Sequence, residues 1–274
     1  MRAYWFDSKN FGDSLNPYLI EKISGHKVIY YPFLSTQFGL KEYHLVCGSI
    51  FFASSPRAII WGAGLISEKQ WIRKAKKILA VRGPLTRKKI LEHGYDCPEI
   101  YGDPALLLPI YYKVPFRKKK YEIGIIPHYV DFKKVKRKLK DGEINVINIC
   151  DSIENVIYEI VSCERTISSS LHGLIVSHAY RVPSLWAEFS NRVIGKGFKF
   201  KDYLLSVNLD IYDPLDLKYT IPNRYELLKY FENKRFDIKI DLELLLSVCP
   251  FREEKNSVLS HMKNTIKLQV AEDF

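Results

Sequence analysis

A serine cluster followed by a histidine is the stretch of this sequence that most clearly suggests chemistry. Ser168, Ser169 and Ser170 follow the strand-like run "RTI", and His172 lies at the start of the helical pattern "LHGLIVSHAYRV". The first turn of a helix has free N–H groups and the positive end of the helix dipole, which together favour an anion. The cluster therefore predicts either a capped helix or an anion-binding catalytic site in which an imidazolium pairs with the anion.

Further polar residues and glycines follow the other predicted strands. In chain order, these strand-end residues are Asn10, Gly12, Asp13, Gly48, Gly64, Arg82, Asp103 and His128. Glycines at such positions let the backbone approach a ligand closely, and several beside polar residues indicate a cleft. The dinucleotide motif GxGxxG and the P-loop motif are absent, as are HExxH and GxSxG, so the sequence offers no standard nucleotide, zinc-protease or hydrolase signature.

Three cations lie where an anion could be bound. Arg82 precedes a helix that begins near Pro84, and a guanidinium there either binds a carboxylate or phosphate or forms a structural ion pair. Lys196 and Lys199 belong to the glycine-containing segment "GKGFKFKDYLLS". This segment is either ordinary surface or a loop between lobes that neutralises a phosphate.

The overall charge also favours anionic partners. The 274 residues include 42 Lys or Arg against 31 Asp or Glu, a net charge of +11. Part of the excess lies in "DFKKVKRKLKDG", which predicts a basic helix with Val135 and Leu139 on a narrow apolar stripe. Its basic residues, Lys133–Lys140, form either a solvated face or a contact with an anionic membrane. Nucleic acid is disfavoured because aromatic residues do not alternate with the basic runs.

The cysteines and the apolar runs indicate the cellular location of the protein. The five cysteines are widely spaced and form no CxxC, which excludes a disulfide framework or a zinc site and predicts buried, reduced thiols. No apolar run reaches the roughly 18 residues of a membrane span. The first residues lack the long apolar core of a signal peptide. We expect a cytoplasmic protein, with peripheral contact to the inner membrane as a possibility raised by the basic helix.

Alternating strand-like and helical segments predict how these residues are positioned. A helix beginning near Asp13, as its cap, and ending at Gly25 follows the first strand, and comparable helices follow later ones. This α/β alternation predicts parallel sheets with right-handed crossovers. We expect two Rossmann-like lobes, residues 1–115 and 121–206, and helices in 207–274 that pack across the lobes. Ligands would bind at the carboxyl ends of the strands, in the cleft between lobes.

The ordered motifs of the chain resemble those of the polysaccharide pyruvyltransferase family. The matching segments are "NFGDSLNPYL", "CGSI", "WGAG", "VRGPLTRKKI", "GDPALLLP", "IGIIPHYVD", "SSSLHGLIVSHAYRVPSLW", "GFKFKDYLLS" and the closing "LLLSVCPF". The resemblance implies two lobes arranged as in GT-B glycosyltransferases. It also implies transfer of a pyruvyl group from phosphoenolpyruvate to a sugar, as a cyclic ketal. The acceptor would belong to a bacterial exopolysaccharide, capsule or cell-wall polymer, often still on its lipid carrier.

One position departs from the family pattern. Many relatives have an arginine two residues before the motif histidine, in an Arg-Leu-His triplet that binds the donor, whereas this chain has Ser170 there. Another cation must then meet the carboxylate or phosphate of the donor. The candidates are Arg82, Arg192, Lys196 and Lys199.

Together, the placement of the residues and the resemblance assign hypothetical roles. His172 pairs with the donor and moves a proton, Asp13 or Asp103 acts as base on the acceptor, and His128 is the alternative base. The predicted donor site comprises Ser168, Ser169, Ser170, Gly173, Arg82, Arg192, Lys196 and Lys199. The predicted acceptor site comprises Asn10, Gly12, Asn16, Gly48 and Gly64. Phosphoenolpyruvate is the donor substrate, and we expect neither a cofactor nor a metal.

Two other functions fit the same sequence. A GT-B-like glycosyltransferase that uses a nucleotide sugar would share the fold, the basic cleft and the phosphate site at a helix N-terminus. A non-enzymatic assembly protein of the polysaccharide machinery would explain the missing arginine at Ser170. Binding of phosphoenolpyruvate or of nucleotide sugars, followed by a thermal shift, would separate the first alternative from pyruvyl transfer.

Overall fold

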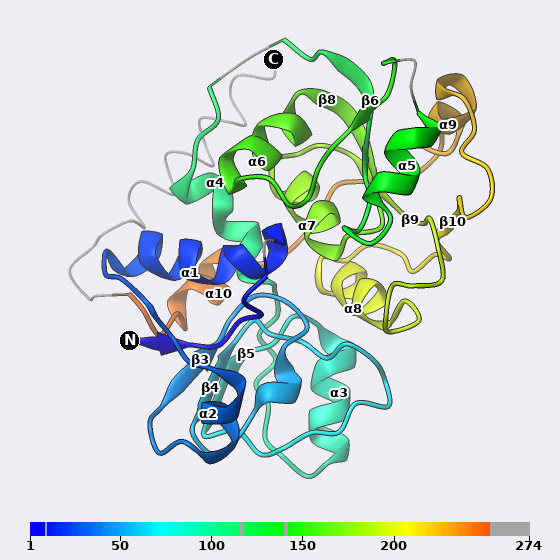
Figure 1. The fold of residues 1–274 in the computed structure, drawn as a ribbon. Helices are drawn as coiled ribbons and strands as arrows, with labels where there is room; N and C mark the ends of the chain where they lie inside the picture. The colour runs from blue at the N-terminus through cyan, green and yellow to red at the C-terminus, as the bar shows by residue number, and fades with distance from the viewer. Residues whose placement is uncertain (9, 116–117, 140–141, 253–274) are drawn as a thin grey trace.

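The computed structural model describes residues 1–8, 10–115, 118–139 and 142–252, and it contains two lobes (Figure 1). Each lobe is built around a five-stranded sheet, ordered β2-β1-β3-β4-β5 in the first and β10-β9-β8-β6-β7 in the second. All strand pairs are parallel. The predicted pair of α/β lobes with parallel sheets is confirmed, and the arrangement fits a Rossmann-like, GT-B-like fold.

The first lobe has short strands. They are β1 Arg2–Ala3, β2 Ile29–Tyr30, β3 Tyr43–Leu45, β4 Ala58–Trp61 and β5 Lys77–Ala80. Its connections include three helical segments that cover or flank the sheet. They are α2 Phe33–Phe38, the 3₁₀ turn η1 Phe51–Ala53 and α3 Pro84–Glu92. The carboxyl ends of β1, β3, β4 and β5 all face the second lobe, because neighbouring parallel strands end at the same edge of a sheet.

The second lobe has a longer central pair of strands. Its strands are β6 Tyr121–Ile126, β7 Asn145–Val146, β8 Cys163–Ser168, β9 Ser184–Glu188 and β10 Leu215–Asp216. Its helices are α5 Phe132–Lys138, α6 Ile153–Val161, α7 Leu171–Ala179 and α8 Phe198–Ser206. β10 follows residue 206 in the chain and pairs with β9, so the segment in which the sequence predicted only helices also supplies an edge strand.

The helix α1, Phe11–Ser24, joins the two lobes (Figure 1). It follows the first strand of the first sheet, yet it packs against α6 and α7 of the second lobe and against α4, Leu108–Tyr111. The Phe11 N–H donates a hydrogen bond to the Ile149 carbonyl at 2.9 Å. Apolar residues from both lobes consequently form one continuous core cluster. The lobes are therefore fixed to one another by packing at the level of α1.

Capping at the ends of α1 differs from the expectation at one end. Asn10, and not Asp13, is the N-cap, and its side chain accepts a hydrogen bond from the Gly12 N–H at 3.1 Å. Asp13 is thereby released from capping and lies in the first turn. Gly25 ends the helix in the left-handed conformation with φ of 69°, as predicted.

The two helices of the tail lie against different lobes. Leu227 of α9, Arg224–Lys229, belongs to the core of the second sheet. The Trp61 indole N–H of the first sheet donates to the Leu245 carbonyl of α10, Leu242–Ser247, at 2.9 Å. Residues 253–274 lie outside the described residues, and both the division of the chain into domains and the packing of the tail across the lobes stay predictions.

Cys150 is an exception to the prediction of buried thiols. Cys47, Cys97, Cys163 and Cys249 are buried, whereas Cys150 is exposed because it lies in the turn between β7 and α6. All five cysteines are free thiols. Within the part of the chain that the structure describes, no helix has the length and apolar character needed to cross a bilayer.

Candidate active site

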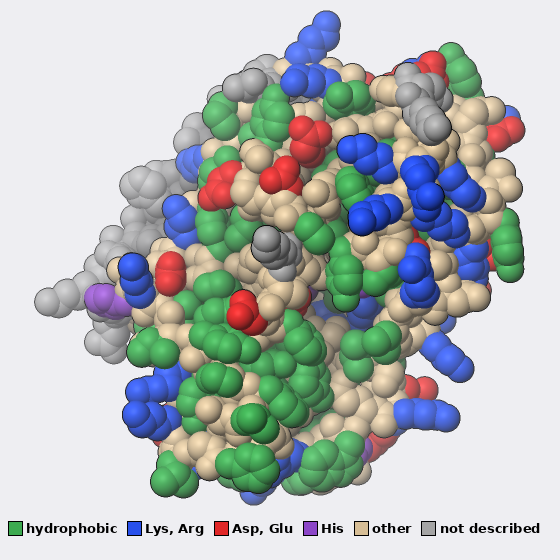
Figure 2. Space-filling view, in the orientation of Figure 1, with side chains coloured by type: hydrophobic (Ala, Val, Ile, Leu, Met, Phe, Trp, Pro, Cys, Tyr) green, Lys and Arg blue, Asp and Glu red, His purple; other side chains and the backbone are tan. Residues whose placement is uncertain are grey.

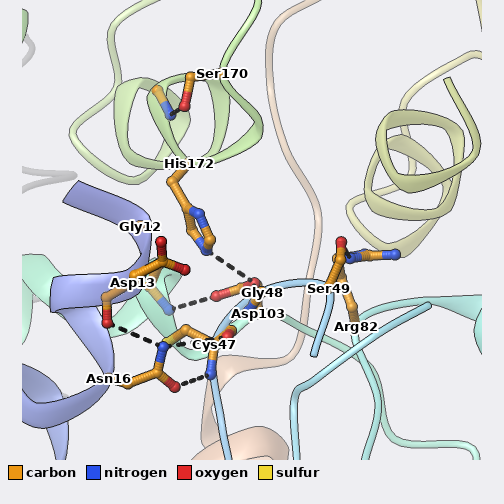
Figure 3. Close-up of polar contacts among 12 residues, drawn as sticks. Gly12, Asp13, Asn16, Cys47, Gly48, Ser49, Arg82, Asp103, Ser170 and His172 are labelled. Carbon is orange, nitrogen blue, oxygen red and sulfur yellow. Dashed lines mark hydrogen bonds and ion pairs between the residues drawn. The ribbon is translucent and has the colours of Figure 1, made fainter. Parts of the chain in front are cut away.

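His172 projects from the first turn of α7 into the junction between the lobes (Figure 3). Its Nε2 lies 3.5 Å from Oδ2 of Asp103, and 12% of its side chain is exposed. Asp103 comes from the first lobe, where it caps the 3₁₀ turn η2, Pro104–Leu107. The pair therefore joins the motif histidine of one lobe to a strand-end carboxylate of the other.

Two glycines make room for the imidazole of His172. A Cβ built on Gly12 would lie 2.1 Å from Nδ1 of His172, and one on Gly48 would lie 3.2 Å from Cε1. Gly48 also has φ of 93°, a conformation that favours glycine. The two strand-end glycines of the first lobe thus form the walls of a slot for the ring, and we infer that this explains their identity better than contact with an acceptor.

Asp103 is held firmly enough to orient the histidine. Its carboxylate is fully buried and accepts hydrogen bonds from the Gly48 N–H at 3.1 Å and the Ala105 N–H at 3.0 Å. Burial raises the pKa of this carboxyl, but the neighbouring His172, the Ala105 amide and the charge of Arg82 together hold it below its ordinary value. Asp103 is therefore an ionised partner that fixes the ring, not a base free to take a proton at neutral pH.

Asn16 fixes the loop that carries Gly48. Its Oδ1 accepts from the Cys47 N–H at 2.9 Å, and its Nδ2 donates to the Cys47 carbonyl at 3.3 Å and to the Asp13 carbonyl at 3.3 Å. The side chain is buried. Asn16 consequently ties α1 to the end of β3 and keeps both walls of the histidine slot in place.

Asp13 lies at the edge of the same junction and has a carboxyl suited to proton transfer. Burial raises its pKa, and the Ser8 hydroxyl, which donates to Oδ2 at 2.6 Å, and the charges of His172 and Lys199 only partly offset this. A carboxyl with a raised pKa is more easily protonated near neutral pH than an exposed one. Its position near both His172 and Lys199 makes Asp13 the most plausible acid or base of the group.

Lys199 supplies a cation at this junction from the second lobe. It lies in the first turn of α8, and burial lowers its pKa to about 8, with the charge of Arg82 lowering it and that of Asp13 raising it. At neutral pH the ammonium is still largely charged. In the space-filling view the surface is hollowed between the two lobes, and Lys or Arg atoms are visible in the hollow (Figure 2).

Arg82 is committed to a buried ion pair between the lobes. Its guanidinium lies 2.9 Å from Oδ2 of Asp202 on α8, and it also donates to Ser49 Oγ at 2.7 Å and to the Leu65 carbonyl at 2.6 Å. Both charged side chains are fully buried. Gly64 is small for the same reason, because a Cβ there would lie 2.5 Å from the Arg82 Cζ. This geometry favours the structural alternative for Arg82 over donor binding.

The serine cluster is used largely by the fold itself. Ser170 caps α7 by accepting from the Gly173 N–H at 3.3 Å, and Ser169 Oγ accepts from the His128 N–H at 2.8 Å. Ser168 Oγ lies 2.8 Å from the Ser170 carbonyl and 3.2 Å from the Ile126 carbonyl. Gly173 has no room for a Cβ, which would lie 2.5 Å from Ser168 Oγ. The three hydroxyls therefore hold the N-terminus of α7 against β6 and position His172.

His128 lies beside this cluster and is neutral at physiological pH. Burial and the charge of Lys199 lower its pKa to about 4, although Asp131 raises it. Its Nδ1 is buried without a hydrogen-bond partner among the described residues. A neutral imidazole with a free ring nitrogen can accept or donate one hydrogen bond to a ligand.

The other two predicted cations are Arg192 and Lys196. Arg192 is largely exposed and pairs with Asp131 at 2.8 Å. Lys196 lines a separate hollow of about 370 Å³ at the end of β9, together with Glu188 and Lys201. Their roles as donor ligands stay predictions, as do those of the other predicted site residues.

Sequence reasoning missed three residues that complete the arrangement. Ser8 bonds to Asp13, Ser49 bonds to Arg82, and Asp202 neutralises Arg82. Ser49 directly follows the strand-end Gly48, which is a usable signal. Asp202 is 120 positions from Arg82 in the chain, so no local pattern links the two.

Comparisons with known proteins show the family of this chain. The family model for polysaccharide pyruvyl transferase matches residues 6–191. The chain is 31% identical over 208 residues to "Uncharacterized protein L143" of Acanthamoeba polyphaga mimivirus, covering 73% of this chain and 72% of that protein. It is 26% identical over 217 residues to "Succinoglycan biosynthesis protein ExoV" of Rhizobium meliloti (strain 1021), covering 74% of this chain and 64% of that protein. No solved structure matches the chain significantly. On this evidence, the chain belongs to the polysaccharide pyruvyl transferase family.

Proposed function

We propose that the protein transfers the pyruvyl group of phosphoenolpyruvate to a sugar of a bacterial surface polysaccharide or its lipid-linked precursor, forming a pyruvate ketal. Membership of the family and the similarity to a succinoglycan biosynthesis protein support pyruvyl transfer in polysaccharide biosynthesis. The observation that carries the proposal is the meeting of His172, Asp103, Asp13 and Lys199 between the lobes. These groups supply a cation, an oriented imidazole and a carboxyl of raised pKa.

The donor requires compensation of its negative charge. Phosphoenolpyruvate carries a phosphate and a carboxylate, and Lys199 is the cation whose burial and location suit them. His172 would add hydrogen bonds from the first turn of α7, where the helix dipole also favours an anion. Arg82 contributes to the positive field without leaving Asp202. The donor would then lie against the second lobe with its reacting carbon toward the first.

The transfer itself requires one acid and one base. Protonation of the methylene carbon of phosphoenolpyruvate makes C2 electrophilic, and a sugar hydroxyl attacks C2 as it gives up its proton. Phosphate leaves with the C2–O bond electrons, and a second hydroxyl closes the ketal as its proton passes to the phosphate or the solvent. We assign the proton donor to His172, held by Asp103, and the base to Asp13, with His128 as the alternative base. We predict that the reaction requires no cofactor.

A peripheral contact with the inner membrane through Lys133–Lys140, on the cytoplasmic side, is part of this proposal. Lys134 of α5 donates hydrogen bonds to the backbone carbonyls of Phe189 and Lys218. Lys138 donates a hydrogen bond to the carbonyl of Tyr219. Lys133, Lys136 and Arg137 are exposed and remain available to anionic headgroups. Lys140 lies outside the described residues.

The test combines donor turnover with a product measurement. The protein is incubated with phosphoenolpyruvate and an isolated or lipid-linked saccharide, and both phosphate release and the mass of the saccharide are followed. We expect release of phosphate in step with the gain of one pyruvyl ketal. His172→Ala should abolish both while its thermal unfolding stays cooperative, and a fully active variant would reject the assignment. Stabilisation by nucleotide sugars without any response to phosphoenolpyruvate would instead favour the glycosyltransferase alternative.

A further inference from the structure

A group of large apolar side chains lies exposed on the first lobe, centred on α2. We call it the α2 surface, and its members are Phe6, Ile29, Phe33, Leu34, Phe38, Leu40 and Trp71. Phe38 is 83% exposed, Leu40 77% and Leu34 72%. Single exposed apolar residues are ordinary, but a contiguous group of this kind marks an interaction site. Figure 2 shows hydrophobic side chains gathered over this part of the lobe.

The α2 surface extends to the edge of the candidate active site. The ring of Phe33 lies 5.7 Å from that of Phe52, and the ring of Phe52 lies 5.5 Å from that of Phe6. Phe6 is two residues before Ser8, whose hydroxyl donates to Asp13. The aromatic contacts therefore extend from α2 to Phe6, and the chain leads from Phe6 to the residue that bonds the carboxyl assigned as base.

Trp71 lies at the border of the same surface. Arg73 places its guanidinium 6.0 Å from the centre of the Trp71 ring and also donates a hydrogen bond to Gln37 of α2. An exposed tryptophan beside an arginine is typical of residues at a membrane–water interface, where the ring is partly buried and its N–H stays hydrated.

Basic residues outnumber acidic ones around the α2 surface, where Asp7 is exposed beside Phe6 and Glu42 is paired with Lys76. The stretch from position 22 to position 41 contains Lys22, Lys27 and Lys41 and not one Asp or Glu. The stretch 132–140, which includes α5, contains six Lys or Arg residues and no Asp or Glu. Basic side chains over α5 and hydrophobic ones over α2 appear on the same face of the molecule, on either side of the hollow between the lobes (Figure 2).

We propose that the α2 surface docks the protein on a bilayer that contains anionic lipids, with its apolar side chains inserted among the lipids and the basic residues of α5 against the headgroups. The combination of inserted apolar groups and surrounding cations is the arrangement that binds peripheral proteins to anionic membranes. The inference rests on the proposed function in one respect, because a lipid-linked acceptor would then be presented beside Asp13. Docking itself can be measured without any transfer.

A second copy of this chain fits the α2 surface less well. Each copy has a net charge of +11, and pairing would bring the basic residues around two such surfaces together. Like charges at an interface oppose association, whereas an anionic bilayer is attracted by them. The charge around the surface therefore favours lipid over self-association.

The first experiment measures partition of the full chain between buffer and sedimented vesicles. One set of vesicles contains phosphatidylglycerol and phosphatidylcholine, and the other contains phosphatidylcholine alone. We expect binding to the anionic set, weaker at high salt, and about tenfold weaker for Leu34→Glu, because burial of one leucine is worth roughly that factor. Leu244→Glu is the matched control, since it places the same substitution at an exposed position on α10 and should bind as the unchanged protein does.

A second measurement follows the environment of Trp71. Its fluorescence should shift to shorter wavelength when anionic vesicles are added. Trp71→Phe should remove most of that shift, because Trp61 and Trp186 are buried and Trp5 is partly buried against Tyr30. Equal binding of Leu34→Glu and Leu244→Glu would overturn the inference, as would an absence of binding to anionic vesicles. Sedimentation velocity that shows a dimer lost only in Leu34→Glu would assign the surface to a second copy and also overturn it.

Failure of this inference is distinguishable from failure of the proposed function. Leu34→Glu should retain phosphate release with a water-soluble saccharide acceptor, because Leu34 is exposed on α2 and is not among the residues assigned to catalysis. If the unchanged protein binds anionic vesicles but releases no phosphate with any acceptor, the docking inference stands and the proposed function fails. If it releases phosphate but does not bind, the reverse holds.

Discussion

Replacing Gly12 with alanine should disable the site by moving His172. The new Cβ would lie 2.1 Å from Nδ1 and 2.8 Å from two ring carbons, whereas ordinary contacts of a Cβ begin near 3.4 Å. The imidazole must therefore move by about 1.3 Å or turn out of its slot, and either change breaks its 3.5 Å contact with Asp103. A misplacement of about 1 Å costs on the order of 10²-fold in rate, so we expect kcat for phosphate release to fall by about that factor.

The stability of the variant separates this mechanism from simple misfolding. Gly12 lies in the first turn of α1, where alanine is favoured over glycine by roughly 0.5–1 kcal/mol. This gain opposes the cost of displacing a partly exposed ring. We therefore expect a denaturation midpoint close to that of the unchanged protein despite the loss of activity. Urea unfolding followed by circular dichroism measures it.

A double-mutant cycle provides the decisive control. In a His172→Ala background the ring is gone, so Gly12→Ala should stabilise the protein by about 0.5–1 kcal/mol, whereas in the unchanged protein the displaced ring offsets this gain. If Gly12→Ala alone keeps the normal kcat, the slot does not position His172. If Gly12→Ala changes the free energy of unfolding equally with and without the His172 ring, the Cβ does not meet that ring, and the reasoning is refuted.

Three further outcomes follow from the charges of the site. Because burial lowers the pKa of Lys199 to about 8, KM for phosphoenolpyruvate should rise as pH increases through 8. Lys199→Met should remove this dependence. A KM that stays flat from pH 7 to 9 in the unchanged protein would contradict the role of Lys199 as the cation that binds the donor. Arg82→Met leaves Asp202 buried without its cation and should lower the free energy of unfolding, measured by urea denaturation, by about 3–5 kcal/mol. A loss under about 1 kcal/mol would contradict a structural role for this ion pair. Burial lowers the pKa of His128 and His178 from 6.5 to about 4, so between these pH values the unfolded chain binds more protons than the folded protein. The free energy of unfolding should therefore fall as pH drops from 6.5 toward 4. A urea denaturation midpoint that does not change with pH in this range would exclude buried neutral histidines.

The parallel sheets could be predicted because their signal is local and repeated. Each short apolar run followed by a helical pattern indicates one βα unit, and glycines and caps such as Ser152 mark where helices begin and end. α2 and β10 were missed for the opposite reason, since each is short and lacks periodicity. From the sequence, no element was predicted for Phe33, Leu34 and Phe38, and only the structure shows that they lie on an exposed helix.

The site could be predicted as a set of positions but not as a set of contacts. Strand-end residues such as Asp13, Asp103 and His172 meet because parallel strands end at one edge and the two lobes face each other. Which of them touch depends on how α1 packs across to α6 and α7, and this packing involves residues more than a hundred positions apart. From the sequence, Gly12 was predicted to contact the acceptor. Its close approach to the His172 ring indicates instead that it leaves space for that ring.

The serine at position 170 can be understood from the same contacts. Ser170 accepts the Gly173 N–H at 3.3 Å from an extended backbone with φ of −94°, and a serine cap stabilises a helix by about 1 kcal/mol relative to alanine. An arginine has no acceptor and could not make this bond. Arg82 cannot supply the missing charge to a donor without abandoning Asp202 and Leu65, both buried. Lys199 lies near Asp13 and His128, and it forms no short ion pair with any residue that the structure describes. We therefore infer that position 170 holds the helix that carries His172, while Lys199 takes over the cationic role.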